Sequence, residues 1–148
     1  MTTAFTILKT SRILILKLIE DLTLEQLQTI PEGFNNNILW NVAHLVVTQQ
    51  LLIYKLSGLN CLVSDEMIER YRKGAMPSTL VSETDYEEII ELFLGLPDTL
   101  QEDYEAGIFK EFHPYKTSVG FELDSLEKAI AFNNYHEGIH LGTIMALK

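Results

Sequence analysis

The sequence predicts an all-α protein, a bundle of four long helices. Two observations carry this prediction: apolar residues recur at steps of three and four along four long segments, and little alternates with the period of two typical of strands. The chain has 148 residues, of which 47% are hydrophobic and 22% charged, as in an ordinary globular protein. We therefore expect a single domain spanning residues 1–148, without internal repeats.

Two long helices and one short helix are expected in the first part of the chain. Apolar residues form one wide stripe from about Ala4 to Leu22. The segment from Thr23 to Gln28 has the threonine and glutamine of a capping box and predicts a brief helix. An asparagine run then supplies an N-cap for a second long helix, from about Asn37 to Leu56, which Ser57 and Gly58 terminate.

A long connection follows, from Gly58 to about Ser82. It contains scattered glycine, proline and serine residues and one short helical patch, from Asp65 to Tyr71. Long connections in small domains are often functional. We therefore expect this connection, between the second and third long helices, to lie near a binding site.

Two more long helices are expected in the rest of the chain. The third runs from Glu83 to about Asp103, and Gly95 and Pro97 should kink or split it. The fourth begins near Asp124, with Asp124 or Ser125 as its cap, and continues almost to the C-terminus.

Charge and cysteine content exclude several classes of function. The formal net charge is −10 and no run of lysine and arginine follows one helix, so we expect no nucleic-acid partner. The single cysteine, Cys61, cannot form an intrachain disulfide and is expected to be a small buried hydrophobe. Neither a signal peptide nor an apolar run of about 20 residues is evident, which predicts no membrane partner and a cytoplasmic location.

Three of the four histidines form a candidate metal site. His136 and His140 are four residues apart, so a helix presents both imidazoles on one face, and His44 occupies an apolar stripe of the second long helix. Three imidazoles with open coordination positions are typical of catalytic metals. The alternative is that each histidine is a separate core residue, hydrogen-bonded to a backbone carbonyl or to Asn41 and Asn133. The residues alone leave these two interpretations evenly balanced.

The segment from His136 to His140 also matches the HExxH pattern of zinc proteases, with Glu137 in the place of the general base. Only eight residues follow His140, whereas those proteases commonly take a third ligand downstream, so the protease interpretation carries little weight. Glu137 remains a candidate catalytic residue. Alternatively, it orients a metal ligand, or its side chain is simply solvated.

Three stretches resemble the DinB-like superfamily of four-helix metal-binding proteins over nearly the whole chain: NNNILWNVAHLVVTQQLLIYKLSG, YRKGAMPST and FNNYHEGIHLGTIMALK. The resemblance implies a four-helix bundle whose metal ligands are His44, His136 and His140. Ala43 stands where relatives often have glycine, a change from one small residue to another. His113 has no counterpart among the ligands and is expected in a loop.

The resemblance also implies chemistry. Relatives with assigned activities include transferases and isomerases that use bacillithiol, mycothiol or glutathione. A divalent cation, zinc or nickel foremost, would lower the pKa of a coordinated thiol or water. We therefore expect a metal-dependent enzyme that transfers a low-molecular-weight thiol to a small electrophile. The alternatives are a non-catalytic metal- or ligand-binding module and a metal-dependent hydrolase.

Basic and aromatic residues supply candidates for substrate binding. Arg70, Arg72 and Lys73 cluster in the long connection, where they could attract an anionic thiol or a substrate carboxylate, or simply form a solvated turn. Tyr71, Tyr135 and Trp40 could line a pocket or belong to the core. Apolar residues that the core does not use, on the outer faces of the first and third long helices, permit a homodimer.

Overall fold

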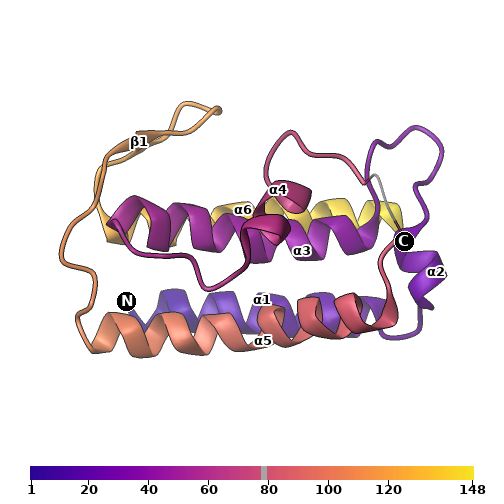
Figure 1. Cartoon of the computed structure of the whole chain (residues 1–148), viewed down its shortest axis with the longest axis horizontal. Coiled ribbons are helices and arrows are strands. Elements are labelled where there is room, and N and C mark those ends of the chain that lie inside the picture. The colour runs from indigo at the N-terminus through magenta and orange to yellow at the C-terminus, as the bar shows by residue number, and fades with distance from the viewer. Residues whose placement is uncertain (78–79) are drawn as a thin grey trace.

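Four long helices run side by side in this computed structural model, which describes residues 1–77 and 80–148 (Figure 1). They are α1 (Thr2–Ile19), α3 (Ile38–Gln49), α5 (Glu83–Glu105) and α6 (Leu126–Leu147). α1 and α3 each pack against both α5 and α6, so the four helices enclose a common core. The predicted all-α four-helix architecture is confirmed. Ser78 and Thr79, at the end of the YRKGAMPST motif, lie outside the described residues.

The predicted helix starts are stabilised by the expected side chains. Thr23 and Gln26 form the reciprocal capping box that begins the short helix α2 (Leu24–Gln28). Asn37 caps α3 by accepting a 2.7 Å hydrogen bond from the backbone N–H of Trp40. Of the two candidate caps for α6, the structure selects Ser125, whose hydroxyl accepts from the backbone of Lys128.

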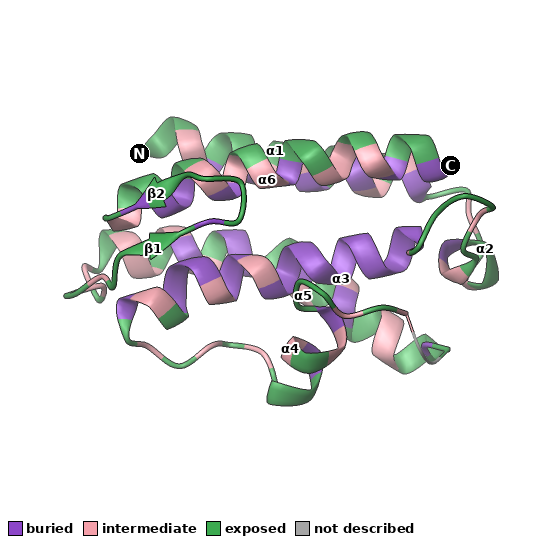
Figure 2. Cartoon of the chain, turned by 90° about the horizontal axis from the view of Figure 1, so that it is seen from above, coloured by how far each residue is buried: buried purple, intermediate pink, exposed green. Residues whose placement is uncertain are grey.

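Helix α3 is the most deeply enclosed element of the bundle (Figure 2). All its residues except Thr48 are buried, because the bundle covers one side and the short helix α4 (Asp65–Tyr71) packs on the other. A helix that is apolar all round must be covered on every side. The helical path continues through a π-helical turn, η1 (Gln50–Tyr54), and a 3-10 turn, η2 (Lys55–Ser57), and ends at Gly58 with φ of 70°.

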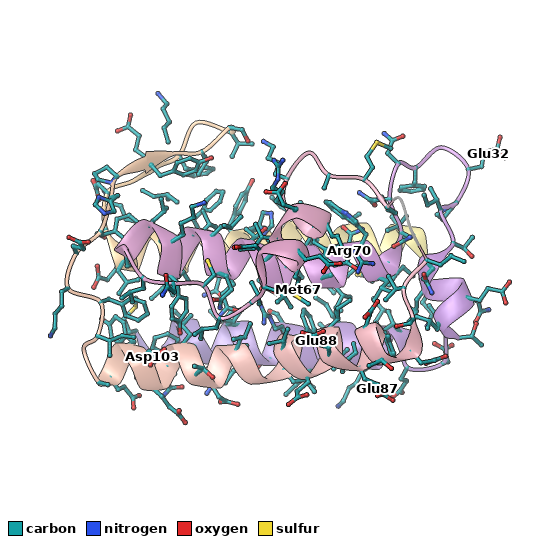
Figure 3. All side chains as sticks on the ribbon, viewed as in Figure 1. Glu32, Met67, Arg70, Glu87, Glu88 and Asp103 are labelled. Atoms are coloured by element: carbon teal, nitrogen blue, oxygen red, sulfur yellow. The ribbon has the colours of Figure 1, made fainter. Side chains whose placement is uncertain are left out.

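Helix α5 passes through Pro97 as one uninterrupted helix, so the predicted split does not occur. Proline lacks the N–H that would donate to the carbonyl of Phe93, four residues earlier. That carbonyl instead accepts a 2.8 Å hydrogen bond from Nη1 of Arg12 on α1. Exposed acidic side chains lie along α5, among them Glu87 and, on the side that faces α4, Glu88 (Figure 3).

A small hairpin joins α5 to α6 and was not predicted. Its strands, β1 (Tyr115–Lys116) and β2 (Glu122–Leu123), pair antiparallel and are too short to show a period of two. The hairpin stands out above the layer that α3 and α6 form, away from α1 and α5 (Figure 1), and β2 contacts α6.

Two further findings concern membrane-spanning helices and the single cysteine. None of the described helices combines the length and apolarity that crossing a bilayer requires. Cys61 is partly rather than fully buried, and this burial raises the pKa of its thiol. The thiolate, which is the reactive form, is therefore disfavoured.

Candidate metal centre

Three histidines from two helices meet on the α3 and α6 side of the bundle. One ring nitrogen from each of His44, His136 and His140 lies within 4.8 Å of the other two. The centroid of the His44 ring is 4.7 Å from that of His140 and 5.2 Å from that of His136. Within residues 1–77 and 80–148, this is the one group of three histidine, cysteine or acidic side chains arranged closely enough to hold a metal ion.

Hydrogen bonds fix the tautomer of His44. Its Nδ1 lies 2.6 Å from the backbone carbonyl oxygen of Tyr71. A carbonyl oxygen can only accept, so Nδ1 carries the proton and Nε2 keeps its lone pair. The hydroxyl of Thr48 lies 3.2 Å from this Nε2, within reach as a donor. The ring therefore presents Nε2 as its metal-binding atom.

The tautomer of His140 is fixed by an asparagine. Nδ1 of His140 lies 2.7 Å from Oδ1 of Asn41. The Asn41 amide cannot be reversed, because its Nδ2 donates to Oδ1 of Asn36 at 2.9 Å and to the carbonyl of Asn37 at 2.8 Å. Oδ1 must therefore accept from His140, which leaves Nε2 unprotonated. A histidine oriented in this way through its second nitrogen is typical of metal ligands.

The two α6 histidines approach each other through Nε2. These nitrogens are 3.2 Å apart, and Nδ1 of His136 is buried without a hydrogen-bond partner among the described residues. Two nitrogens bound to one zinc at about 2.1 Å, with an angle of roughly 90 to 110° between the bonds, lie about 3.0 to 3.4 Å apart. The observed separation matches two ligands of a single metal.

All three imidazoles are held in the neutral form that a metal needs. Burial, reinforced by the neighbouring His44 and by Lys73, lowers the pKa of His136 to about 4. Burial and the two other histidines lower the pKa of His140 to about 3. Burial also lowers the pKa of His44, against the effect of its bond to Tyr71. A neutral imidazole keeps a lone pair free for coordination.

The alternative interpretation, in which the three histidines are independent core residues, fits the structure only in part. His44 and His140 do bond to a backbone carbonyl and to Asn41, as that interpretation expects. These bonds use Nδ1, while the Nε2 atoms of His136 and His140 lie 3.2 Å apart and a nitrogen of each histidine lies within 4.8 Å of the others. Asn133 bonds to none of the histidines, and both polar atoms of its side chain are buried without a partner in the described part of the chain. The geometry favours one shared site.

Glu137 turns into the bundle interior. It is fully buried, and its Oε1 accepts hydrogen bonds from Nε and Nη2 of Arg12 at 3.2 and 2.8 Å. A general base must lie within hydrogen-bond reach of the proton that it removes. These contacts give Glu137 the role of neutralising a buried guanidinium and favour that role over general-base catalysis.

The predicted substrate-binding residues fall in different places. Lys73 lies near the histidines, where its charge lowers the pKa of His44 and His136, and its ammonium contacts Ser118 in the hairpin. Arg72 is exposed and pairs with Glu69 at 2.9 Å. Arg70 reaches from α4 toward α5, where it lies 3.8 Å from Asp85 (Figure 3).

Tyr135 contributes to an aromatic wall beside the centre. Its ring packs against Phe121 of the hairpin and Phe132 of α6, with centroids 5.5 and 5.8 Å away. The Phe132 ring lies 6.4 Å from that of His136. Of the four predicted substrate-binding residues, the structure thus brings Lys73 and Tyr135 toward the histidines.

Two components of the site escaped sequence reasoning. The carbonyl of Tyr71 is a backbone group and leaves no signal in the sequence. Arg12 did leave one, since it lies in line with the buried Leu8 and Ile15 on the apolar stripe of α1. A charged residue in such a stripe needs a buried partner.

Comparison with known proteins agrees with this geometry. A sequence model described as the DinB superfamily matches residues 7–144, nearly the whole chain. A search of curated proteins gave no match.

Proposed function

Because this chain belongs to the DinB superfamily and gathers three imidazoles at one point, we propose that it is a metal-dependent enzyme. His44, His136 and His140 hold the divalent cation, with zinc or nickel the foremost candidates. The observation that carries this proposal is the 3.2 Å approach of two Nε2 atoms while the Nδ1 atoms of His44 and His140 are engaged elsewhere. Three protein ligands leave coordination positions for a substrate.

The chemistry we propose is transfer of a low-molecular-weight thiol to a small electrophile. When bound, the cation lowers the pKa of a coordinated thiol or water and so supplies a nucleophile at neutral pH. The chain contributes Lys73, whose charge attracts an anionic substrate, and the wall formed by Phe121, Phe132 and Tyr135, which offers apolar surface beside the centre. Arg70 and Arg72, which lie against Asp85 and Glu69, are assigned no part in this step.

Glu137 enters this proposal as a positioning residue. It follows His136 directly, and its bond to Arg12 ties that turn of α6 to α1. Holding the turn in place keeps the two α6 imidazoles at a fixed separation.

Metal content tests the proposal. Protein purified without a histidine tag is expected to contain about one equivalent of a transition metal by plasma mass spectrometry. His44→Ala and His136→Ala are expected to lose it. The matched control is His113→Ala, because His113 lies in the exposed loop before the hairpin and should not affect the metal.

Activity assays separate the remaining functions. Turnover that requires both a thiol and an electrophile, and that His136→Ala abolishes, supports the transferase. Turnover without an added thiol assigns a metal-dependent hydrolase instead. A protein that takes up no metal after reconstitution leaves a ligand-binding helical module as the better interpretation.

We also propose that the protein is a cytoplasmic homodimer. Exposed apolar side chains on α1 support the dimer, namely Ile7, Ile13 and Leu14. Light scattering of the purified protein distinguishes a dimer from a monomer, and subcellular fractionation tests the compartment.

A further inference from the structure

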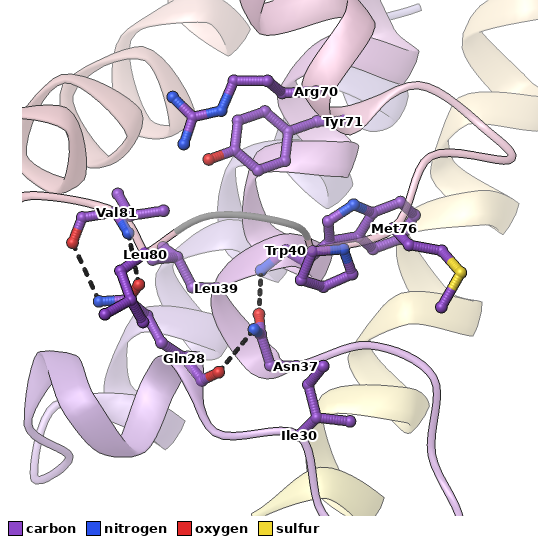
Figure 4. A pocket seen from close by; sticks show the side chains of 11 residues that line it. Gln28, Ile30, Asn37, Leu39, Trp40, Arg70, Tyr71, Met76, Leu80 and Val81 are labelled. Carbon is purple, nitrogen blue, oxygen red and sulfur yellow. Dashed lines mark hydrogen bonds between the residues drawn. The ribbon is translucent and has the colours of Figure 1, made fainter.

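A pocket of about 240 Å³ lies beside the start of α3, next to the candidate metal centre (Figure 4). Side chains from α2, α3, α4 and residues 76–77 and 80–81 are among those that surround it. In Figure 4, Arg70 and Tyr71 lie on one side, and Gln28, Asn37 and Ile30 lie on the other. Pockets for small molecules commonly measure about 300 to 1,000 Å³, so this one suits a small ligand.

Most of the pocket wall is apolar. It includes Ile30, Leu39, Met76, Leu80 and Val81. Leu80 is 85% exposed and Met76 61% exposed, so two large apolar side chains stand at an open mouth. An apolar ligand body would cover this surface and remove it from water.

Two hydrogen-bond donors in the wall have no acceptor. Nε1 of Trp40 and the hydroxyl of Tyr71 are buried without a partner among the described residues, and both side chains line the pocket. The exposed fractions of the two residues are only 7% and 5%. Buried polar groups normally find a partner, and an indole N–H can act only as a donor.

The other polar groups of the pocket are already satisfied. Gln28 bonds to both the N–H and the carbonyl of Val81, and Asn37 links the carbonyl of Gln28 to the N–H of Trp40 (Figure 4). These bonds hold the floor of the pocket in place. The guanidinium of Arg70 lies at the rim, 5.4 Å from the centre of the Tyr71 ring, and Asp85 at 3.8 Å offsets part of its positive charge.

We propose that this pocket binds a small apolar molecule that carries hydrogen-bond-accepting oxygens, of the class of short monocarboxylic acids. The oxygens accept from both the Tyr71 hydroxyl and Nε1 of Trp40, the apolar body packs against the aliphatic wall, and the part of the Arg70 charge that Asp85 does not offset favours an anion. None of the three histidines lines the pocket, so this site is separate from the metal centre. The proposal goes beyond the function proposed above and does not depend on a metal.

The pocket nevertheless shares its wall with the metal centre. The Trp40 ring stacks on that of His44, with centroids 4.7 Å apart and planes 11° from parallel. The backbone carbonyl of Tyr71 holds Nδ1 of His44. A ligand in the pocket therefore contacts the two residues that orient one predicted metal ligand.

Trp40 is the single tryptophan of the chain, so its fluorescence reports directly on the pocket. The experiment is a fluorescence titration with hexanoate, made on both the metal-free and the metal-loaded protein. We expect a saturable change in both forms. Hexylamine has the same apolar chain but no acceptor when protonated, and it should give no such change.

Two tyrosine variants test the contact. Tyr71→Phe removes the hydroxyl but keeps the backbone carbonyl that holds His44, so it should weaken hexanoate binding about 2- to 10-fold and leave metal content unchanged. Tyr104→Phe is the matched control, because Tyr104 packs against Phe5 and does not line the pocket. Its affinity for hexanoate should equal that of the wild type.

Three results would overturn the proposal. One is the absence of a saturable change with hexanoate, butanoate and benzoate alike. The others are equal binding of hexanoate and hexylamine, and an affinity that Tyr71→Phe leaves intact. Because the metal-free protein is titrated as well, failure of this proposal is distinguishable from failure of the metal centre.

Discussion

Arg12 on α1 donates a hydrogen bond of 2.8 Å to the carbonyl oxygen of Phe93 on α5. This is the carbonyl that Pro97 leaves without its helical donor. The same guanidinium bonds to Glu137 on α6 and reaches the carbonyl of Leu45 on α3 at 3.4 Å. One buried side chain thus links α1 to the other three long helices.

Removing this guanidinium should strongly destabilise the fold. Arg12→Met leaves the Glu137 carboxylate buried and unpaired and the Phe93 carbonyl without a donor, which should lower the free energy of unfolding by about 3 to 5 kcal/mol. Urea denaturation measures the loss. Lys9→Met on the same helix is the control, since its pair with Asp98 is partly exposed and worth less than about 1 kcal/mol. Equal losses in the two variants would contradict this account.

The amide of Asn41 should control metal affinity without being a ligand. Asn41→Leu removes the acceptor that orients His140, and we expect a roughly 10- to 100-fold loss of affinity in competition with a chelator. Asn134→Leu is the matched control, because its amide donates to the carbonyl of Ala4 on α1 instead. A metal affinity that is unchanged in Asn41→Leu would show that His140 needs no such support.

The stability of the metal-free protein should fall as the pH is lowered from about 7 toward 4. Folding lowers the pKa of His136 from 6.5 to about 4 and that of His140 to about 3. Below pH 6.5 the unfolded chain therefore binds more protons than the folded one, and acid favours unfolding. Above pH 7 these two groups contribute no pH dependence. The stability that these two histidines contribute at neutral pH is lost completely only below their folded-state pKa values of about 4 and 3.

Urea midpoints measured across this pH range test the sign. His136→Asn should flatten the dependence, because it removes one of the shifted groups. His113→Asn, in the exposed loop, should leave it as in the wild type. A steeper dependence in His136→Asn would be incompatible with a lowered pKa.

Lys73 should act on substrate capture rather than on the chemical step. Lys73→Met removes a charge near the histidines, and we expect KM for an anionic substrate to rise roughly five-fold, about 1 kcal/mol, with kcat retained. Added salt should weaken the difference from the wild type. Arg72→Met removes a charge that already pairs with Glu69 and should change KM much less. A loss confined to kcat would place Lys73 in the chemistry instead.

The features that the sequence determined by itself are those set by neighbouring residues. The helical segments follow from apolar spacing, and the caps at Thr23 and Asn37 act within three residues of their own position. The pairing of His136 with His140 follows from one turn of helix. Such interactions need no distant partner, and for that reason they can be read from the chain.

The features that only the tertiary structure decided depend on partners far away in sequence. Pro97 does not split α5, because Arg12 lies 85 positions earlier and satisfies the carbonyl that the proline frees. Glu137 lies beside two predicted metal ligands in sequence, yet it faces Arg12, whose position on a neighbouring helix the local pattern does not specify. The tautomer of His44 depends on the backbone of Tyr71, which carries no side-chain signal. Packing chooses such partners, because burying an unpaired polar group costs more free energy than local preferences can supply.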